Sequence, residues 1–274
     1  TAISDTLEFL PATMTQTVTV NVVGDTLDEF DETFSLTLSN PSGGSQLGNT
    51  SGAGTILDDD EQPTFTIEDV SVAEGSGTAV FTAILSAPSG KTITVDYATM
   101  DDTAVAPDDY AETSGTFTFA PGSTEESAAI PIVNDTLDEF DETFTLELSN
   151  ESNVTLANTI AQATITDDDD EPTISIENVT ITEGNSGTTT ANFTVNLSAP
   201  SGKTVTVDYQ TSPGSATAGT DYLTASGTLT ISPGVASATI PVIVNGDTLD
   251  EVDETFSIML SNPTNATILV GTAV

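Results

Sequence analysis

The side chains of this chain that could do chemistry are carboxylates at regular spacing. The phrase Asp-Thr-Leu-Asp-Glu begins at Asp25, Asp135 and Asp247, and a further glutamate follows each copy. A second acidic phrase, Asp-Asp-Asp-Glu, begins at Asp58 and Asp168 and leads into a proline. Calcium accepts oxygen ligands of this kind in flexible geometry. Two oxygen-rich clusters per repeat therefore predict a divalent-cation site.

The charge balance also favours a bound cation. The chain carries 43 acidic and 2 basic residues, which gives a formal net charge of −41. Self-repulsion of this size opposes a compact state unless counter-ions bind. Nucleic acids and anionic membrane surfaces both attract lysine and arginine, which this chain almost lacks. We therefore expect Ca2+ as the cofactor, and neither nucleic acid nor a membrane as a partner.

Several other chemistries lack the residues that they need. The absence of Cys and His excludes zinc ligation by thiolate or imidazole, a cysteine nucleophile and a Ser-His-Asp triad. Paired carboxylates cleave glycosides in some enzymes. Such an enzyme needs one cleft, normally lined by aromatic side chains, whereas here aromatic residues are 5% and the acids recur in every repeat. We therefore expect no enzyme activity.

The period of the acidic phrase predicts tandem domains. Its copies lie 110 and 112 residues apart, which fits domains rather than short solenoid repeats. We expect residues 1–60 to be the C-terminal half of a domain, 61–170 a complete domain, and 171–274 a domain that lacks its last strand and aspartate run. We also expect a piece of a longer protein, because residue 1 is not Met. No run of about 18 apolar residues occurs, so we expect no membrane insertion in this segment.

The hydrophobic pattern predicts an all-β fold. Thr, Val, Ile and Phe alternate in short runs that Gly, Pro, Asn and Asp interrupt, which is typical of strands. About seven strands in the middle unit fit a two-sheet sandwich. We therefore expect tandem, antiparallel, immunoglobulin-like β-sandwiches. The strands predicted for the middle unit are 64–73, 78–86, 91–99, 114–119, 126–133, 142–149 and 161–166.

Strand pairing would bring the two acidic phrases together. Strand 142–149 begins directly after one phrase, and strand 161–166 ends directly at Asp167. If these strands pair antiparallel, the start of one lies beside the end of the other. Both clusters then occupy one pole of the sandwich, where like charges raise carboxyl pKa values unless a cation compensates.

The second repeat contains a succession of motifs. They are Glu74-Gly75, Asp96-Tyr97, Asp109-Tyr110, the phrase 135–142 and the run Asp167-Asp168-Asp169. This succession resembles the Calx-beta domain. Such domains are calcium-binding β-sandwich modules that occur in tandem in surface and adhesin-type proteins and form the calcium sensor of sodium–calcium exchangers. The resemblance implies calcium at one pole of each sandwich.

The resemblance also implies a set of calcium ligands in each repeat. Asn134 and Gly246 stand where the family's sensors carry a further aspartate, which favours one or two ions per site. The second repeat offers Glu74, Asp109, Asp135, the carbonyl of Leu137, Glu139, Glu142, Asp167, Asp168 and Asp169. The third repeat offers Glu183, Asp221, Asp247, Glu251 and Glu254. The first repeat offers Asp25, Glu29, Glu32, Asp58, Asp59 and Asp60.

Other charged residues have structural interpretations. Asp28, Asp138 and Asp250, the fourth residues of the acidic phrases, are expected to be solvated rather than to bind metal. Lys91 and Lys203 both lie in the sequence Ser-Gly-Lys-Thr. A phosphate-binding loop would need an earlier glycine and a following helix, so this sequence predicts a hairpin turn.

Glycine and tyrosine residues beside the motifs are also expected to have structural roles. Gly75 and Gly184 are expected in turns at positive φ. The tyrosines are expected to pack in the core or at its corners. They are Tyr97, Tyr110, Tyr209 and Tyr222.

These observations favour a calcium-binding structural or adhesive array within a longer extracellular or cell-surface protein. Calcium would rigidify the domains and their short linkers, such as residues 169–172. The partners would be calcium and neighbouring repeats of the same or adjacent chains. Two alternatives stay open: a calcium-sensing regulatory module of the exchanger type, and a subunit of a surface filament completed by neighbouring chains.

Overall fold

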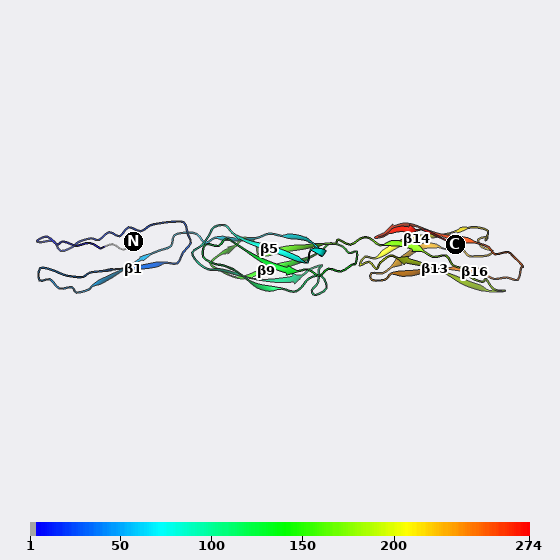
Figure 1. Cartoon of the computed structure of the whole chain (residues 1–274), viewed down its shortest axis with the longest axis horizontal. Helices are drawn as coiled ribbons and strands as arrows, with labels where there is room; N and C mark the ends of the chain where they lie inside the picture. The colour runs from blue at the N-terminus through cyan, green and yellow to red at the C-terminus, as the bar shows by residue number, and fades with distance from the viewer. Residues whose placement is uncertain (1–3) are drawn as a thin grey trace.

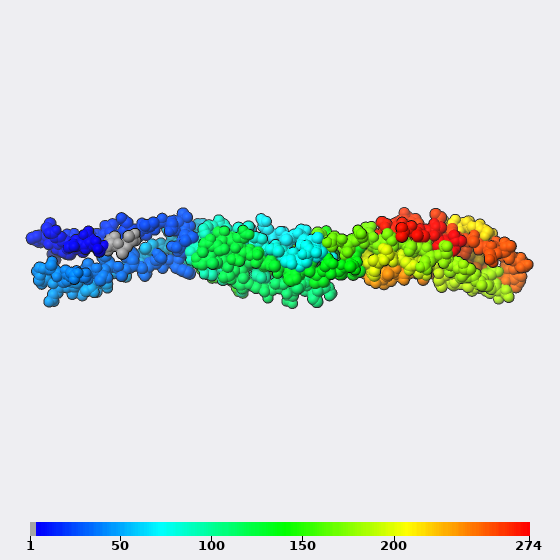
Figure 2. All heavy atoms as spheres, in the orientation of Figure 1, coloured from blue at the N-terminus to red at the C-terminus, as the bar shows by residue number. Residues whose placement is uncertain are grey.

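The molecule is a row of β-structures laid end to end (Figure 1). The computed structural model describes residues 4–274, and the chain runs along the row in sequence order. The space-filling view shows the same extended outline (Figure 2). Among the described residues the single helix is one 3-10 turn, η1 (Glu74–Ser76), and the predicted all-β class is confirmed. No helix in residues 4–274 has the length and apolar character needed to cross a bilayer.

The second unit is built from two sheets around one core. Their strand orders are β10-β3-β5-β8 and β4-β11-β9-β6-β7. Buried side chains from both sheets form the core, as expected of a sandwich. The strands are β3 (Thr64–Ile67), β4 (Val70–Ala73), β5 (Thr78–Leu85), β6 (Ile93–Asp101), β7 (Ser114–Phe119), β8 (Glu125–Pro131), β9 (Glu142–Ser152), β10 (Thr155–Leu156) and β11 (Ile160–Thr166).

Strand pairing at the acidic pole follows the prediction, with one change. β9 and β11 pair antiparallel, with Glu142 opposite Ile165. The single strand predicted for 64–73 is wrong, because β3 belongs to one sheet and β4 to the other. The apolar positions change phase across Glu68 and Asp69, from Phe65 and Ile67 to Val70 and Val72, and this is where the chain changes sheet. β4 pairs parallel with β11, with Ala73 opposite Thr166, and this places η1 beside the end of β11.

Aromatic side chains occupy the buried positions of the alternating pattern. Phe144, on β9, is fully buried, and the ring of Tyr110 stacks on it with centroids 4.2 Å apart. Tyr222 is also buried, while Tyr97 and Tyr209 pack against the two cores. The packing predicted for the tyrosines is therefore confirmed.

The third unit repeats this architecture around a second core. Its sheets have the orders β16-β13-β12-β18 and β15-β14-β17-β19. Residues 179–182 correspond to β4 but form no strand, because β19 ends at Ala273, before the positions that would pair with them. The strands are β12 (Thr173–Ile176), β13 (Thr188–Leu197), β14 (Val205–Pro213), β15 (Ser226–Ile231), β16 (Ser237–Asn245), β17 (Phe256–Thr264), β18 (Thr267–Val270) and β19 (Thr272–Ala273).

The first unit contains one small antiparallel sheet. It consists of β1 (Glu32–Thr37) and β2 (Ser51–Ile56), with Glu32 opposite Ile56. Residues 4–31 form no strand. A two-stranded sheet buries little apolar surface, so side chains such as Phe9, 56% exposed, and Met14, 92% exposed, stay in solvent.

The two glycine predictions have different outcomes. Gly184 has a φ of +91°, so its prediction is confirmed. The prediction for Gly75 is wrong, because the positive φ of that turn, +75°, belongs to Gly77. Gly75 instead permits a close approach, since a β-carbon there would lie 2.7 Å from Asp168 Oδ2.

Phe144→Ala should destabilise the second unit by about 3–5 kcal/mol, because it removes a fully buried ring and leaves a cavity. Val80→Ala is the control, since Val80 is 49% exposed in the same unit, and such surface changes cost about 0.5 kcal/mol or less. Urea unfolding followed by circular dichroism measures both variants. Equal losses of stability would contradict the assignment of Phe144 to the core.

Candidate metal centre

Three segments of the chain meet at one pole of the second unit. Glu74 begins η1 directly after β4, the phrase 135–142 lies between β8 and the start of β9, and the run 167–169 follows β11. β11 lies between β4 and β9 in its sheet, so the ends of these strands bring the three segments together. The fold therefore positions acids that are distant in the sequence.

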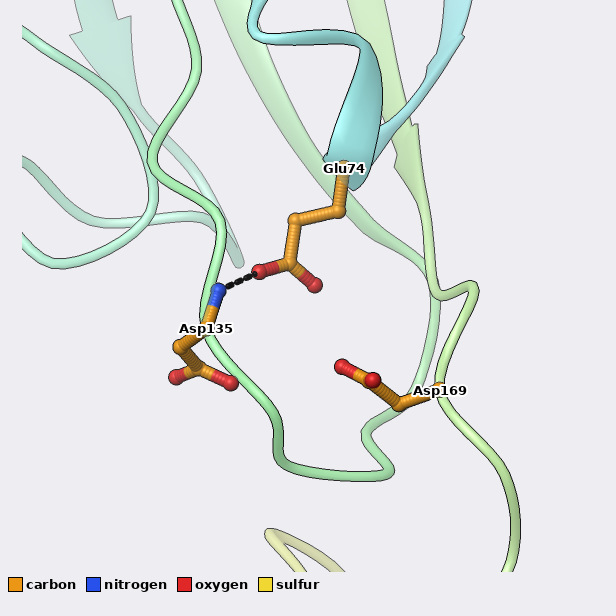
Figure 3. A group of neighbouring side chains, drawn as sticks. All are labelled: Glu74, Asp135 and Asp169. Carbon is orange, nitrogen blue, oxygen red and sulfur yellow. Dashed lines mark hydrogen bonds between the residues drawn. The ribbon is translucent and has the colours of Figure 1, made fainter.

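Glu74, Asp135 and Asp169 form a close group at this pole. One carboxylate oxygen from each lies within 4.8 Å of the others. The three side chains surround a common space (Figure 3). The backbone amide of Asp135 donates a hydrogen bond to Glu74 Oε1 at 2.5 Å, which holds the buried glutamate in place. Each of the three segments thus offers an oxygen to one point.

A small cavity of about 20 Å³ lies beside Glu74 and Asp135. A single water needs roughly 10–15 Å³, so the cavity has room for one small ion. Asp167 lines it, and its Oδ1 is buried without a hydrogen-bond partner among residues 4–274. A buried carboxylate oxygen without a donor is costly unless a cation compensates it. The acids lining the cavity are Glu74, Asp108, Asp109, Asp135, Glu139, Glu142 and Asp167.

Burial and like charges raise the pKa of several acids at this pole. Burial, followed by the charge of Asp109 and a hydrogen bond with it, raises the pKa of Glu142 from 4.5 to about 7. Burial and then neighbouring carboxylates also raise the pKa values of Glu139 and Asp169. The charged forms are therefore disfavoured by their surroundings, and a divalent cation relieves that cost.

Three members of the predicted ligand set do not line the cavity: Leu137, Asp168 and Asp169, of which Asp169 belongs to the close group with Glu74 and Asp135. The other two have contacts of their own. Asp168 Oδ2 accepts a hydrogen bond of 3.3 Å from the amide of Gly75. The amide of Leu137 donates to Asp135 Oδ1 at 2.7 Å, which closes a turn within the acidic phrase. Both residues therefore shape the segments that carry the lining acids.

Two acids at this pole were missed by the sequence analysis. Asp108 lines the cavity next to Asp109. Asp141 Oδ1 accepts a hydrogen bond of 3.1 Å from the amide of Asp167, which ties the aspartate run to the acidic phrase. The same contact joins Asp31 and the amide of Asp58 at 3.1 Å. The recurrence of an aspartate at this position of the phrase is the signal that could have identified it.

The acids predicted for the third unit gather in a more open site. Each of two groups places its ligand oxygens within 4.8 Å of one another. A cavity of about 680 Å³ lies beside them and is lined in part by residues 179–182. It is wider than in the second unit because those residues pair with no strand. The groups are Glu183, Asp247 and Glu251, and Asp221, Glu251 and Glu254.

The acids predicted for the first unit do not converge to ligand distance within the described part of the chain. Burial and then like charges still raise the pKa values of Glu29 and Asp60. Burial opposes the shift of Asp58, but hydrogen bonds from the backbone of Glu29 and from Lys91 lower its pKa. Among residues 4–61, none takes the place that Glu74 has in the second unit, so the acids described here lack that side of the site.

The expectation that Asp28 and Asp138 are solvated is wrong. Their exposed fractions are 2% and 3%, because the Ser-Gly-Lys bend of the following unit covers each of them. Asp250 is exposed, as predicted. Lys91 and Lys203 lie in bends between consecutive strands, but the flanking strands belong to different sheets, so the predicted hairpin turn is wrong.

Glu142→Gln should stabilise the chain in chelator as the pH rises. A carboxyl with a folded pKa of about 7 and an ordinary pKa of 4.5 stabilises the fold fully below pH 4.5. That contribution is lost as the pH rises towards about 7, and glutamine does not lose it. Calorimetry at pH 5 and pH 8 measures the melting temperature of each protein. Between these two pH values, the melting temperature of the variant should fall less than that of the parent. Glu151→Gln, on an exposed residue of β9, is the control. A fall equal to the parent's would contradict the raised pKa.

Comparison with known proteins places this site in a family. The Calx-beta domain model matches residues 1–61, 58–169 and 167–273. Extracellular matrix protein 3 of Lytechinus variegatus is 31% identical over 271 residues, which cover 89% of this chain and 8% of that protein. Sodium/calcium exchanger 1 of Canis lupus familiaris is 40% identical over 78 residues, which cover 28% of this chain and 8% of that protein.

One solved structure has a similar sequence. The crystal structure of calcium binding domain CBD12 of CALX1.1 is 26% identical, with a TM-score of 0.39, and covers 73% of this chain and 79% of that chain. This chain spans less than a tenth of the curated relatives named above. The family match extends over nearly all of its residues, and the chain belongs to the Calx-beta domain family.

Proposed function

We propose that this chain is a calcium-binding structural array of Calx-beta repeats. The observation that carries the proposal is the buried, unpartnered Oδ1 of Asp167 beside a cavity lined by further carboxylates. Calcium suits this donor set because it takes six to eight oxygens and tolerates irregular geometry. Thiolate and imidazole ligands are absent from the chain, so its donors for a metal are oxygens.

The ligands that we assign in the second repeat come from all three converging segments. Glu74 contributes from η1, Asp135, Glu139 and Glu142 from the acidic phrase, and Asp167 from the end of β11. The cavity of about 20 Å³ supports one ion there. We assign the two acid groups of the third repeat in the same way, and divide the chain into repeats at residues 60–61 and 170–171.

Calcium in this position would fix the direction in which the chain leaves the second repeat. An ion shared by the acidic phrase and the run after β11 would hold the run against the sandwich. The link to the next repeat follows directly and ends at Pro172, which is buried and restricts Glu171 to extended conformations. Binding would therefore stabilise the repeat and stiffen its exit.

An extracellular setting would keep such sites occupied. Extracellular calcium modules work with dissociation constants of about 10⁻⁴–10⁻³ M. The relative that aligns with 89% of the chain is named as an extracellular matrix protein. We therefore place the array outside the cell, as part of a surface or matrix protein with a structural or adhesive role.

A calcium sensor is the second candidate function. The similarity to sodium/calcium exchanger 1, 40% over 78 residues, favours it. Sensor sites work with dissociation constants of about 10⁻⁷–10⁻⁵ M, whereas extracellular modules work near 10⁻⁴–10⁻³ M. The measured affinity of the intact chain therefore distinguishes the two functions.

Glu139→Ala and Asp168→Ala should each weaken one class of calcium sites in the intact chain. Glu139 lines the cavity and Asp168 supports the segment around it, and losses of roughly 10–100-fold are typical even of supporting groups. Titration calorimetry in metal-free buffer measures the affinity and the number of sites. Glu151→Ala, an exposed acid of β9, is the control and should leave both unchanged. Absence of calcium binding by the parent chain, or an equal loss in the control, would contradict the proposal.

A further inference from the structure

The two basic residues of the chain occupy equivalent positions. Both are lysines, Lys91 and Lys203, and each lies in a Ser-Gly-Lys turn at the end of its unit that faces the preceding unit. Lysine side chains on a protein surface are mostly exposed to solvent. The side chains of Lys91 and Lys203 are instead only 11% and 13% exposed.

The contact between the second and third units is centred on Asp138. Lys203 Nζ lies 2.7 Å from Asp138 Oδ1 and 3.7 Å from Asp167 Oδ2. Ser201 Oγ donates to the carbonyl oxygen of Asp138 at 3.0 Å and lies 3.1 Å from its Oδ2. The amide of Gly202 donates to the same carbonyl at 3.1 Å. The charge, the side chain and the backbone of one aspartate are therefore all paired across the joint.

The contact between the first and second units repeats this arrangement. Lys91 Nζ lies 2.7 Å from Asp28 Oδ1 and 3.4 Å from Asp58 Oδ2. Ser89 Oγ donates to the carbonyl of Asp28 at 3.0 Å and to its Oδ2 at 2.8 Å. The amide of Gly90 donates to that carbonyl at 2.9 Å.

An aromatic ring completes each joint. Lys203 Nζ lies 5.2 Å from the centroid of the Phe140 ring, and Lys91 Nζ lies 5.3 Å from that of Phe30. A cation within about 6 Å of a ring centroid is attracted by the ring's quadrupole. The third copy of the phrase carries Val252 at this position, where it is 83% exposed.

We propose that the Ser-Gly-Lys turn and the fourth residue of the Asp-Thr-Leu-Asp-Glu phrase form a specific interface between consecutive repeats, which the lysine closes without calcium. A buried carboxylate without a partner strongly destabilises the folded state. A following repeat that supplies a cation at this point therefore forms a more stable joint than one that does not. Asp250 contacts no following unit among residues 4–274 and is exposed there. The interface thus determines which repeats can follow one another, apart from any role of calcium.

Distance measurements between two spin labels on the intact chain test this interface. The chain has no cysteine, so Thr118→Cys on β7 and Thr230→Cys on β15 give one label on either side of the second joint. All samples contain excess chelator, which separates this test from the proposed function. The parent should give one narrow distance distribution.

Lys203→Met and Asp138→Asn should each broaden that distribution on the order of twofold, because each removes one partner of a buried pair. Lys203→Arg keeps the charge and should stay narrow. Lys91→Met changes only the other joint, and Asp250→Asn changes an aspartate without a partner turn, so both should match the parent. Circular dichroism of each variant verifies folding.

Two results would overturn the interface. One is a parent distribution in chelator that is already as broad as that of Lys203→Met. The other is equal broadening by Lys91→Met, which would show that the effect does not depend on the joint being measured. If Lys203→Met does not fold, Asp138→Asn is compared with Lys203→Arg instead. The distribution should broaden in Asp138→Asn, which loses the ion pair, and stay narrow in Lys203→Arg, which keeps it.

Discussion

Repulsion between carboxylates at one pole of each sandwich is the constraint on which the rest of the structure depends. The pairing of β4, β11 and β9 fixes three strand ends together, and each strand end carries acids. The buried core, including Phe144 and Tyr110, holds those strands in register. The acids cannot move apart without breaking the sheet, so burial, together with their charges, raises the pKa values of Glu139 and Glu142.

Two kinds of cation can relieve this repulsion, and they act at different places. Lysine is covalently part of the next repeat and lies between units, where it contacts Asp138 and, at a longer distance, Asp167. The proposed calcium ion lies within a unit, where the second oxygen of Asp167 has no donor. Asp167 therefore faces both the joint and the cavity. The same crowding of carboxylates therefore accounts for the proposed calcium site within the unit and for the lysine contact between units.

Much of this arrangement could be predicted from the sequence, because it depends on local patterns. Period-two alternation predicts the strands, and the positions of the acids relative to strand ends predict that they meet at one pole. The change of sheet between β3 and β4 does leave a signal, because the apolar positions change from Phe65 and Ile67 to Val70 and Val72 across two acidic residues. The close approach at Gly75 depends on Asp168, which lies 93 residues away in the sequence. The burial of Asp138 depends on the next unit, and no pattern within its own repeat indicates that neighbour.

The most direct measurement of this account is the thermal unfolding of the intact chain in excess chelator and in millimolar calcium at matched ionic strength. Ligand that binds only the folded state stabilises it by mass action, by about 2.7 kcal/mol at a concentration of 100 times the dissociation constant. The account predicts a melting temperature several degrees higher in calcium, together with a smaller increase in magnesium, whose stricter octahedral geometry suits this donor set less well. Coincident melting curves in chelator and calcium would contradict the claim that the crowded carboxylates form a calcium site.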